Sequence, residues 1–158
     1  MTHERTGELK VSKIRRGTVV DHIKAGMAPA VLRILGIFPG FPNVAIVAMN
    51  VKSEVLGYKD IVKLEDVMLT EDMLQKIATI APQATMNVID DFQITDKYEV
   101  SLPEVLHGIL KCPNRYCISN SPEGVESRFA LEHTAPIAEY RCHYCEELVQ
   151  ADRAELIF

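Results

Sequence analysis

Four cysteines near the end of the chain are arranged as two close pairs. Cys112 and Cys117 form the first pair, Cys142 and Cys145 form the second, and the 158-residue sequence has no other cysteine. Each pair is short enough to wrap one tight turn around a metal ion. Four thiolates at this spacing suit a closed tetrahedral zinc site, which leaves no position for water or substrate. We therefore expect a structural zinc ion rather than a catalytic one.

Other uses of these cysteines explain less of the pattern. A thiol–disulfide motif would account for Cys142-His-Tyr-Cys145 but would leave the other pair unexplained. Two disulfides would suit a secreted protein, whereas the N-terminal residues show no apolar signal segment, so we expect a cytoplasmic protein. An iron–sulfur or rubredoxin-like iron site remains open, because sulfur ligands alone do not select the metal. His143, between two ligands, is expected to lie on the surface of its turn.

The composition indicates a folded chain without a general affinity for nucleic acid. Apolar residues make up 47% of the sequence, which is enough for a hydrophobic core. The formal charge is -5 and the pI is near 5.5, whereas nucleic-acid-binding proteins usually carry a basic face. No run approaches the roughly 20 apolar residues that span a bilayer, so we expect no membrane segment. A local cationic pocket for a small anion remains compatible with this charge.

The first half of the chain predicts a strand, a helix and a second strand. Residues 9–23 have the pattern of an extended segment with a kink or turn at Gly17. An apolar face recurs at helical spacing over residues 27–38, and the glycines and proline at 36–40 end that helix. Residues 44–49 are apolar on both faces, which favours a central strand.

The next segments predict a strand, a helix and a further strand. Residues 58–64 alternate between two faces, as a half-buried strand does. Thr70 is a good N-cap for the following helix, and Pro82 ends it by restricting the residue before it. Residues 85–94 then have a strand pattern, with a bulge or bend expected at Asp90-Asp91.

Residues 9–97 therefore follow the order β-α-β-β-α-β. This is the ferredoxin-like order, in which both helices cover one face of the sheet. Lys59 and Lys63 would lie on the other face if Val62 and Leu64 point toward the helices. Two lysines on one strand face suit an anionic ligand, although a solvated lysine face is the favoured explanation at this point.

The C-terminal residues predict a small, mainly-β zinc domain. Residues 128–131 and 138–140 have the pattern of short strands between the two cysteine pairs. A segment of about 50 residues rarely builds a sufficient core alone, and metal binding supplies the missing stability. We expect a flexible arm over residues 1–8, a ferredoxin-like α+β domain over 9–100 and a zinc domain over 101–158.

Taken in order, several segments resemble the regulatory chains of aspartate carbamoyltransferase, an enzyme of pyrimidine biosynthesis. The resemblance runs over essentially the whole chain, and although any one segment is a weak signal, their succession is very specific. The segments are Arg16-Gly-Thr-Val-Val-Asp-His-Ile23, Tyr58-Lys-Asp-Ile-Val-Lys-Leu64, Ala81-Pro-Gln-Ala-Thr-Met-Asn-Val-Ile-Asp90, Ser101-Leu-Pro-Glu104, Cys112-Pro-Asn-Arg-Tyr-Cys-Ile-Ser-Asn120 and Cys142-His-Tyr-Cys-Glu146.

The resemblance implies a non-catalytic, allosteric subunit. In this family the N-terminal domain binds the nucleotides CTP, UTP and ATP, with Mg²⁺ as an accompanying ion, and the zinc domain holds the catalytic chain. Two regulatory chains pair through their N-terminal domains, and three such dimers bridge two catalytic trimers. These properties are expectations for the present chain.

The resemblance also implies a set of nucleotide-binding residues. Asp21 is expected to contact the ribose, His22 and Lys97 the phosphates, and Lys63 the base and ribose. Lys59 is expected near a phosphate. The backbone of the first strand is expected to read the edge of the base, and later strands complete the site; these residues are Val11, Ser12, Lys13, Ile14, Ile61, Asn87, Ile89, Phe92 and Ile94. Lysines beside an apolar slot match the chemistry of a nucleoside triphosphate.

The chain departs from the family pattern at a few of these positions. Phe92 stands where the family often has tyrosine, so a hydroxyl contact to the ligand is absent. Ser12 replaces a common acidic residue, and Lys13 replaces a small one. The first cysteine turn also differs from the usual pattern, and we expect the surface that meets the catalytic chain to include Asn114, Arg115, Tyr116 and Glu146.

Two other classes of function are weaker alternatives. Zinc ribbons often serve as nucleic-acid-binding or transcription-associated modules, but Lys111, Arg115 and Arg141 are the fixed cations near these cysteines and the net charge is negative. An enzyme would need a catalytic arrangement such as Ser-His-Asp or Cys-His, and the sequence shows none with supporting context. We therefore expect no catalytic residues.

Overall fold

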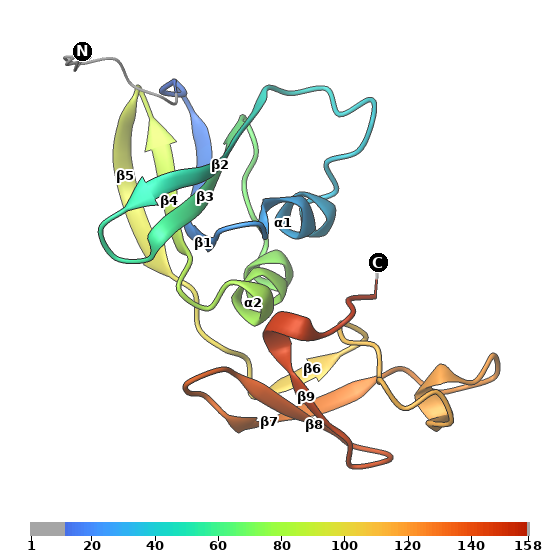
Figure 1. Ribbon diagram of the computed structural model, residues 1–158. Helices are drawn as coiled ribbons and strands as arrows, with labels where there is room; N and C mark the ends of the chain where they lie inside the picture. Colours follow the sequence, from blue (N-terminus) through green and yellow to red (C-terminus); the bar gives the residue numbers. More distant parts are fainter. Residues whose placement is uncertain (1–11, 158) are drawn as a thin grey trace.

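The computed structural model describes residues 12–157, which form two antiparallel sheets (Figure 1). The first sheet has the order β2-β3-β1-β4-β5. Together with two helices it forms what we call the N-terminal domain: β1 (Gly17–Lys24), α1 (Ala28–Ile34), β2 (Ala45–Ser53), β3 (Gly57–Glu65), α2 (Glu71–Ile80), β4 (Thr85–Asp90) and β5 (Gln93–Glu99). The first four strands and both helices follow the predicted order, so the ferredoxin-like α+β prediction is confirmed.

The two helices begin with different capping groups. Thr70 accepts a hydrogen bond from the backbone N–H of Met73, as predicted for an N-cap of α2. The residue before α1, Met27, offers no capping side chain. Instead the carboxylate of Asp60, on β3, accepts hydrogen bonds from the backbone N–H groups of Gly26 and Ala28 at 2.9 and 3.0 Å. The start of α1 is therefore held by a tertiary contact.

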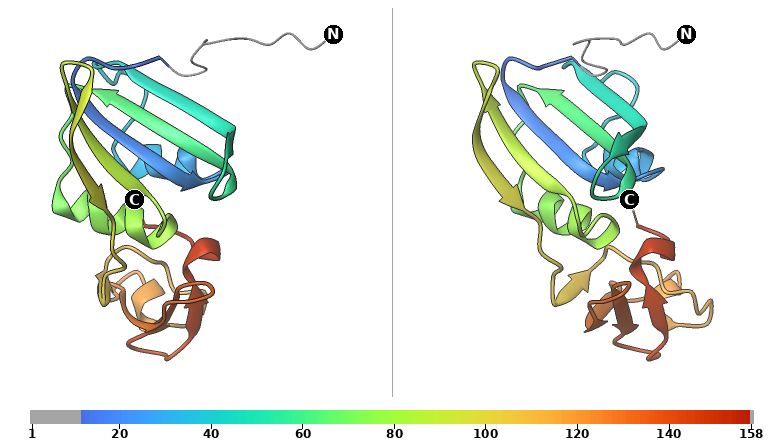
Figure 2. Two further views of the ribbon diagram at one scale, coloured as in Figure 1. Left: turned by 90° about the vertical axis from the view of Figure 1, so that its left-hand side faces the viewer. Right: turned by 60° about the vertical axis from the view of Figure 1, so that its left-hand side comes forward.

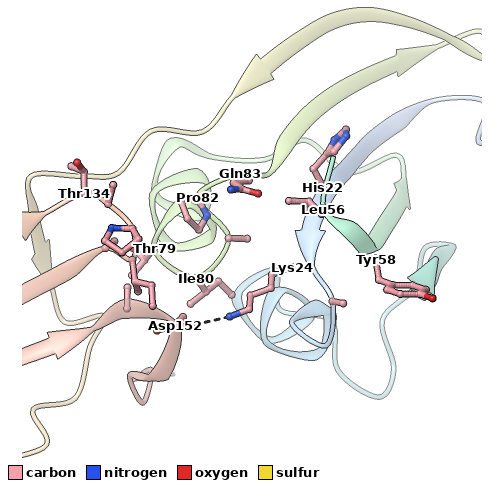
Figure 3. A pocket seen from close by; sticks show the side chains of 17 residues that line it. His22, Lys24, Leu56, Tyr58, Thr79, Ile80, Pro82, Gln83, Thr134 and Asp152 are labelled. Atoms are coloured by element: carbon pink, nitrogen blue, oxygen red, sulfur yellow. Dashed lines mark hydrogen bonds and ion pairs between the residues drawn. The ribbon is translucent and has the colours of Figure 1, made fainter. Parts of the chain in front are cut away.

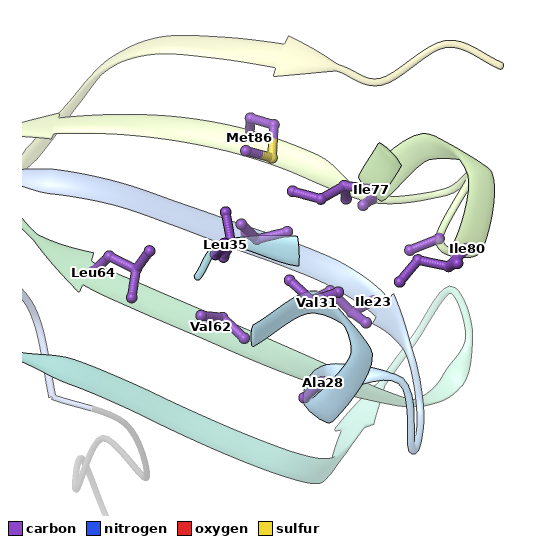
Figure 4. Packing of buried hydrophobic residues seen from close by; sticks show 12 residues of the cluster. Ile23, Ala28, Val31, Leu35, Val62, Leu64, Ile77, Ile80 and Met86 are labelled. Atoms are coloured by element: carbon purple, nitrogen blue, oxygen red, sulfur yellow. The ribbon is translucent and has the colours of Figure 1, made fainter. Parts of the chain in front are cut away.

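The core of the N-terminal domain lies between the sheet and the two helices (Figure 4). Val62 and Leu64 of β3 and Ile23 of β1 are fully buried there, against Val31 of α1 and Ile77 of α2. Burial of such side chains from water is the main stabilising term in a domain of this size. Because alternate residues of β3 point to this core, the residues between them point to the opposite face, which neither helix covers (Figure 2).

The second sheet forms what we call the C-terminal domain, with the order β6-β7-β8-β9. Its strands are β6 (Val105–His107), β7 (Arg128–His133), β8 (Glu139–Cys142) and β9 (Leu148–Gln150), with short 3-10 helices η1 (Ile118–Asn120) and η2 (Ala151–Arg153). β7 and β8 confirm the two predicted strands. Phe129 and Tyr140 fill the core, and the Tyr140 hydroxyl donates to the Pro103 carbonyl at 3.0 Å. Burial raises the pKa of Tyr140 to about 12.

The two domains pack against each other through the end of the chain. Leu156 contacts both hydrophobic cores, and η2 lies beside α2 (Figure 1). Leu156 also forms an isolated antiparallel bridge with Leu110. Within residues 12–157, no helix is long and apolar enough to cross a membrane.

The first strand is shorter than the sequence pattern predicted. Residues 12–16 have no strand pairing, and β1 begins at Gly17. Gly17 has φ +143°, and a Cβ at this position would lie 1.9 Å from the Leu64 carbonyl oxygen. The close approach requires glycine and turns the chain out of the sheet. Val11 and the predicted arm over residues 1–8 lie outside the described residues.

The prediction that residues 44–49 form a central strand is wrong. β2 is an edge strand, paired only with β3 among the described strands. Its apolar residues on both faces remain partly accessible to solvent: Val47 is 39% and Met49 is 43% exposed. The predicted first helix is also too long, because α1 stops before Gly36, at φ +71°, and leaves Phe38 exposed in the following loop.

The predicted bend at Asp90-Asp91 is a complete chain reversal. Asp91 and Phe92 have φ values of 47° and 62°, which is the geometry of a two-residue hairpin turn. The chain then returns as β5, a fifth strand that the sequence pattern did not predict. Lys97, expected after the last strand, therefore lies within β5 and pairs in register with Asn87 of β4.

Candidate metal centre and ligand cavity

The four cysteines converge on one point of the C-terminal domain. Their Sγ atoms all lie within 4.8 Å of one another, with Cys112–Cys145 at 3.5 Å and Cys117–Cys142 at 3.7 Å. Tetrahedral zinc with Zn–S bonds of about 2.3 Å requires S···S separations of roughly 3.8 Å. The separations are far longer than the roughly 2.05 Å of a disulfide. The donor set therefore fits one tetrahedral metal ion.

Backbone and side-chain hydrogen bonds hold the first cysteine turn in place. The Asn120 side chain donates to the carbonyls of Cys112 and Asn114, at 2.8 and 2.7 Å. The Ser119 hydroxyl donates to the Cys117 sulfur at 3.2 Å. These bonds orient the first cysteine turn and the Cys117 sulfur toward the other two cysteines.

The electrostatics of the cluster favour a bound cation. Burial raises the pKa of the Cys112 and Cys142 thiols, because a buried thiolate loses its hydration. Burial acts in the same direction on Cys117, but hydrogen bonds from Ser119 outweigh it and lower the pKa of Cys117 to about 7. Four thiolates in one buried site need a positive charge between them, and a divalent metal supplies it.

Of the four residues predicted to meet the catalytic chain, two expose a ring and a guanidinium that lie against each other, and two take part in hydrogen bonds of the cysteine turns. Tyr116 is 83% exposed, and the Arg115 guanidinium lies 5.0 Å from the centre of its ring. Asn114 instead uses its side-chain oxygen to accept the backbone N–H of Tyr116. Glu146 has φ +64°, and its carbonyl accepts a hydrogen bond from Arg141. Arg115 and Tyr116 thus form an exposed surface between two of the clustered cysteines, Cys112 and Cys117.

A cavity of about 320 Å³ opens on the face of the first sheet that the helices leave free. It is of the size of small-molecule sites. It brings together residues from four strands, from the turn between β4 and β5 and from the segment before β1: Lys13, Ile14, Val19, Asp21, Ile61, Lys63, Asn87, Ile89, Phe92 and Ile94. All but Val19 were predicted for the nucleotide site, so segments far apart in the sequence converge as the resemblance implied.

The floor of the cavity is apolar and contains one unpaired polar atom. Ile14, Val19 and Ile89 form a small buried cluster with Ile61 beside it. Asn87 is 8% exposed, and its Oδ1 has no hydrogen-bond partner within the described residues. A buried amide oxygen without a partner is costly, so a ligand that donates a hydrogen bond there would satisfy it.

Asp21 connects the cavity to a lysine and a histidine. Its Oδ1 lies 2.9 Å from Lys59 Nζ and accepts the backbone N–H of His22 at 2.6 Å. His22 has φ +56°, and its Nδ1 lies 3.2 Å from the Thr85 hydroxyl. Neither Lys59 nor His22 lines the cavity itself; His22 faces a second cleft between the domains. Their roles at phosphates stay predictions.

Lys63 reaches across the cavity to the segment before β1. Its Nζ donates to the Ser12 carbonyl at 2.9 Å, which is the contribution of Ser12 to the site. Partial burial lowers the pKa of Lys63, Asp21 opposes this change, and Lys13 adds to it. An anionic ligand would favour the charged ammonium and act against the effect of burial.

The strand register places Lys97 on the face of the first sheet that carries the cavity. Lys97 pairs with Asn87, and Val19 pairs with both Asn87 and Lys63 across the neighbouring strands. Directly paired residues project to the same side of an antiparallel sheet. The cavity floor is therefore bordered by the lysines at 59, 63 and 97.

Three residues near these sites were not predicted to have a role there. Val19 lies two residues before Asp21, and alternation along β1 would have identified it. Asn120 follows the first cysteine turn and has no distinctive spacing. Asp60 reads as one charged residue among several, and only the tertiary structure shows that its carboxylate joins β3 to the start of α1 and to Asn50 of β2.

In a comparison with known proteins, the N-terminal and C-terminal domains match two domains of one and the same chain. Residues 9–101 match the family described as aspartate carbamoyltransferase regulatory chain, allosteric domain. Residues 104–155 match the metal-binding domain of the same regulatory chain.

Individual relatives match over nearly their whole length. The aspartate carbamoyltransferase regulatory chain of Archaeoglobus fulgidus is 49% identical over 144 residues, which cover 90% of this chain and 94% of that protein. The regulatory chain of Methanothermobacter thermautotrophicus is 47% identical over 151 residues, 96% of each protein. That of Saccharolobus islandicus is 48% identical over 139 residues, 88% of this chain and 87% of the relative.

Proposed function

Because this chain belongs to the family of aspartate carbamoyltransferase regulatory chains, we propose that it senses nucleotides in the cavity of its N-terminal domain. It passes their effect through the metal-held C-terminal domain to the catalytic chain. The observation that carries this proposal is the cavity itself, which joins an apolar floor, an unpaired amide oxygen at Asn87 and a border of lysines. The chain itself carries out no catalysis.

The proposed effectors are CTP, UTP and ATP, with Mg²⁺ as the accompanying ion. The base lies on the apolar floor, and Asp21 binds the ribose hydroxyls. Lys59, Lys97 and His22 contact the phosphates, which extend along the sheet from the cavity. The pairing of Lys59 with Asp21 supports this arrangement, since it places the ammonium at the edge of the cavity. Lysine ammonium groups form strong charge-assisted hydrogen bonds with phosphate.

Replacing Lys63 with methionine is expected to weaken CTP and ATP binding by about 10- to 100-fold. A hydrogen bond to a charged group contributes about 1.5–3 kcal/mol, and methionine keeps the apolar stem. Titration calorimetry of the metal-loaded chain measures the change. Lys111→Met removes a lysine of the C-terminal domain, far from the cavity in the fold, and should bind as the unchanged chain does. Equal affinity for Lys63→Met, or no binding by the unchanged chain, would contradict the proposal.

The metal is proposed to be one zinc ion per chain, held by Cys112, Cys117, Cys142 and Cys145. The tetrahedral fit of the sulfur positions supports this choice. The domains are proposed to divide near residue 100: Val100 packs against the first core and Leu102 against the second.

The proposed assembly has two catalytic trimers bridged by three regulatory dimers. The exposed pair Arg115 and Tyr116, with Asn114 and Glu146 nearby, is proposed to meet the catalytic chain, because interfaces favour exposed aromatic and arginine side chains. The edge strand β2 is proposed as part of the homodimer surface. Its exposed Val47 and Met49 would otherwise be an aggregation risk, and so would its outer backbone edge, which pairs with no other strand within residues 12–157.

A further inference from the structure

We propose that the ion pair between Lys24 and Asp152, called the tie below, holds the two domains in one arrangement. We further propose that a nucleotide bound in the cavity of the N-terminal domain moves this ion pair. Lys24 Nζ lies 3.3 Å from Asp152 Oδ2 (Figure 3). Lys24 ends β1 of the N-terminal domain, and Asp152 belongs to η2 of the C-terminal domain. The tie rests on the proposed function only where it concerns the nucleotide.

The tie spans a cleft that gives the domains room to move. A cavity of about 710 Å³ separates them, lined by the end of β1, the end of α2, the loop between β7 and β8, and η2. Its walls are mostly apolar, and Figure 3 shows Lys24 reaching across it toward Asp152. The other lysine ion pairs of the described residues each join two residues of one domain. A cleft between packed domains is the geometry in which hinge motion occurs.

On the N-terminal side, the tie is three residues from the nucleotide cavity. Asp21 lines the cavity, and Lys24 holds the tie. Between them the register of β1 against β3 shifts, and His22 adopts φ +56°. A non-glycine residue in this conformation is strained, and such strain persists only when its surroundings enforce it. Here the enforcing contact is the hydrogen bond from the His22 N–H to Asp21 Oδ1.

A bound nucleotide would disturb that contact by competing for Lys59. Asp21 Oδ1 accepts both the Lys59 ammonium and the His22 N–H. A triphosphate carries more charge than one carboxylate, so Lys59 would turn to the phosphates and leave Asp21 with a single partner. The ribose hydroxyls, which are proposed to bind Asp21, would then compete with the His22 N–H for its carboxylate. Once that hydrogen bond is lost, the conformation at His22 would relax, and Lys24 would move with it because only Ile23 lies between them. The effect reaches the domain boundary without any change in the sheet core.

On the C-terminal side, the tie is fixed to the metal-held sheet. Ala151 is 3% exposed in the core, and its N–H donates to the Ala138 carbonyl beside β8. Asp152 follows directly, and β8 ends at the metal-binding Cys142. A shift of Asp152 therefore moves η2 together with the sheet that carries the metal site. This gives the nucleotide a physical route to the surface that the catalytic chain contacts.

Lys24→Met should loosen the domain arrangement in the absence of any nucleotide. The labels are attached to unnatural amino acids at Val55 and Glu123, one exposed site in each domain, so that the metal-binding cysteines stay unlabelled. The distance between the two labels reports how the domains are arranged in the metal-loaded chain. We expect a broader distance distribution for Lys24→Met than for the unchanged chain. Lys111→Met is the matched control, because it breaks a lysine–glutamate pair of the same 3.3 Å length within one domain. The double variant Lys24→Asp, Asp152→Lys should restore the narrow distribution.

A distribution for Lys24→Met that equals the unchanged chain would overturn the tie, whatever the nucleotide does. The coupling is then tested by adding CTP or ATP at saturation, with binding confirmed by calorimetry. We expect the distribution to shift in the unchanged chain and not in Lys24→Met. In the complex with the catalytic chain, we expect the effector response to fall by about two- to fivefold. Binding without any shift would refute the coupling and leave the nucleotide site intact, whereas absence of binding would refute the proposed function alone.

Discussion

Removing the metal is expected to unfold the C-terminal domain while the N-terminal domain stays folded. Structural zinc contributes about 10–16 kcal/mol of binding free energy at neutral pH, which in small modules is folding free energy. The cysteines belong to the C-terminal core beside Phe129 and Tyr140. Loss of the metal therefore removes the link between the two cysteine pairs and, with it, the packing of this core. The N-terminal core is formed mainly by its own sheet and helices, apart from Leu156.

Amide hydrogen exchange before and after treatment with a mercurial and a chelator separates the two domains. We expect protection of β6–β9 to disappear and protection of β1–β4 to remain. The stripped chain should also dissociate from the catalytic chain, since the exposed pair at Arg115 and Tyr116 would lose its support. Re-addition of zinc should restore both. Persistent protection of β7 and β8 after complete metal loss would show that the metal does not hold this domain.

Asp60→Ala is expected to destabilise the N-terminal domain by about 3–5 kcal/mol. Asp60 is fully buried and accepts hydrogen bonds from the backbone N–H groups of Gly26, Ala28 and Asn50, at 2.9, 3.0 and 3.0 Å. Alanine would leave all three donors without this partner, and the Ala28 N–H would be buried and unpaired. Each hydrogen bond to a charged group contributes about 1.5–3 kcal/mol, so the loss of three gives an energy of this order. Because Lys59 and Ile61 flank it on the cavity face, nucleotide affinity should also fall.

Denaturant unfolding of the N-terminal transition measures this loss. The stability of Asp60→Asn should lie between that of the unchanged chain and that of Asp60→Ala, because the amide keeps one acceptor oxygen but turns an NH₂ group toward the donors. Asp96→Ala, an exposed aspartate of β5 in the same sheet, is the matched control and should change stability by less than about 0.5 kcal/mol. A loss for Asp60→Ala as small as that of the control would contradict the role assigned to these hydrogen bonds.

The features that sequence patterns predicted correctly depend on local physics. Thr70 and Pro82 mark the limits of α2 through capping and backbone restriction, which need no tertiary partner. The alternation of β3 placed Val62 and Leu64 in the core and put Lys59 and Lys63 on the opposite face. The spacing of the cysteines predicted one metal centre because short loops restrict where each sulfur can lie.

The features that were missed depend on tertiary context. An apolar run such as β2 reads as a central strand because the sequence does not show which neighbours a strand has. The turn at Asp91-Phe92 lacks the glycine that usually marks a tight hairpin, so β5 was hidden. Asp60 acts on residues far away in the sequence, and no local pattern distinguishes a buried aspartate from a solvated one.

The effect of nucleotides on reconstituted complexes tests the regulatory account most directly. Catalytic trimers of aspartate carbamoyltransferase would be assayed across aspartate concentrations, alone and with the zinc-loaded chain, each with and without CTP or ATP. We predict that nucleotide changes the aspartate dependence only when this chain is present, and that Lys63→Met reduces the change. An aspartate dependence that nucleotides leave unaltered, in a complex that has bound them, would contradict the account.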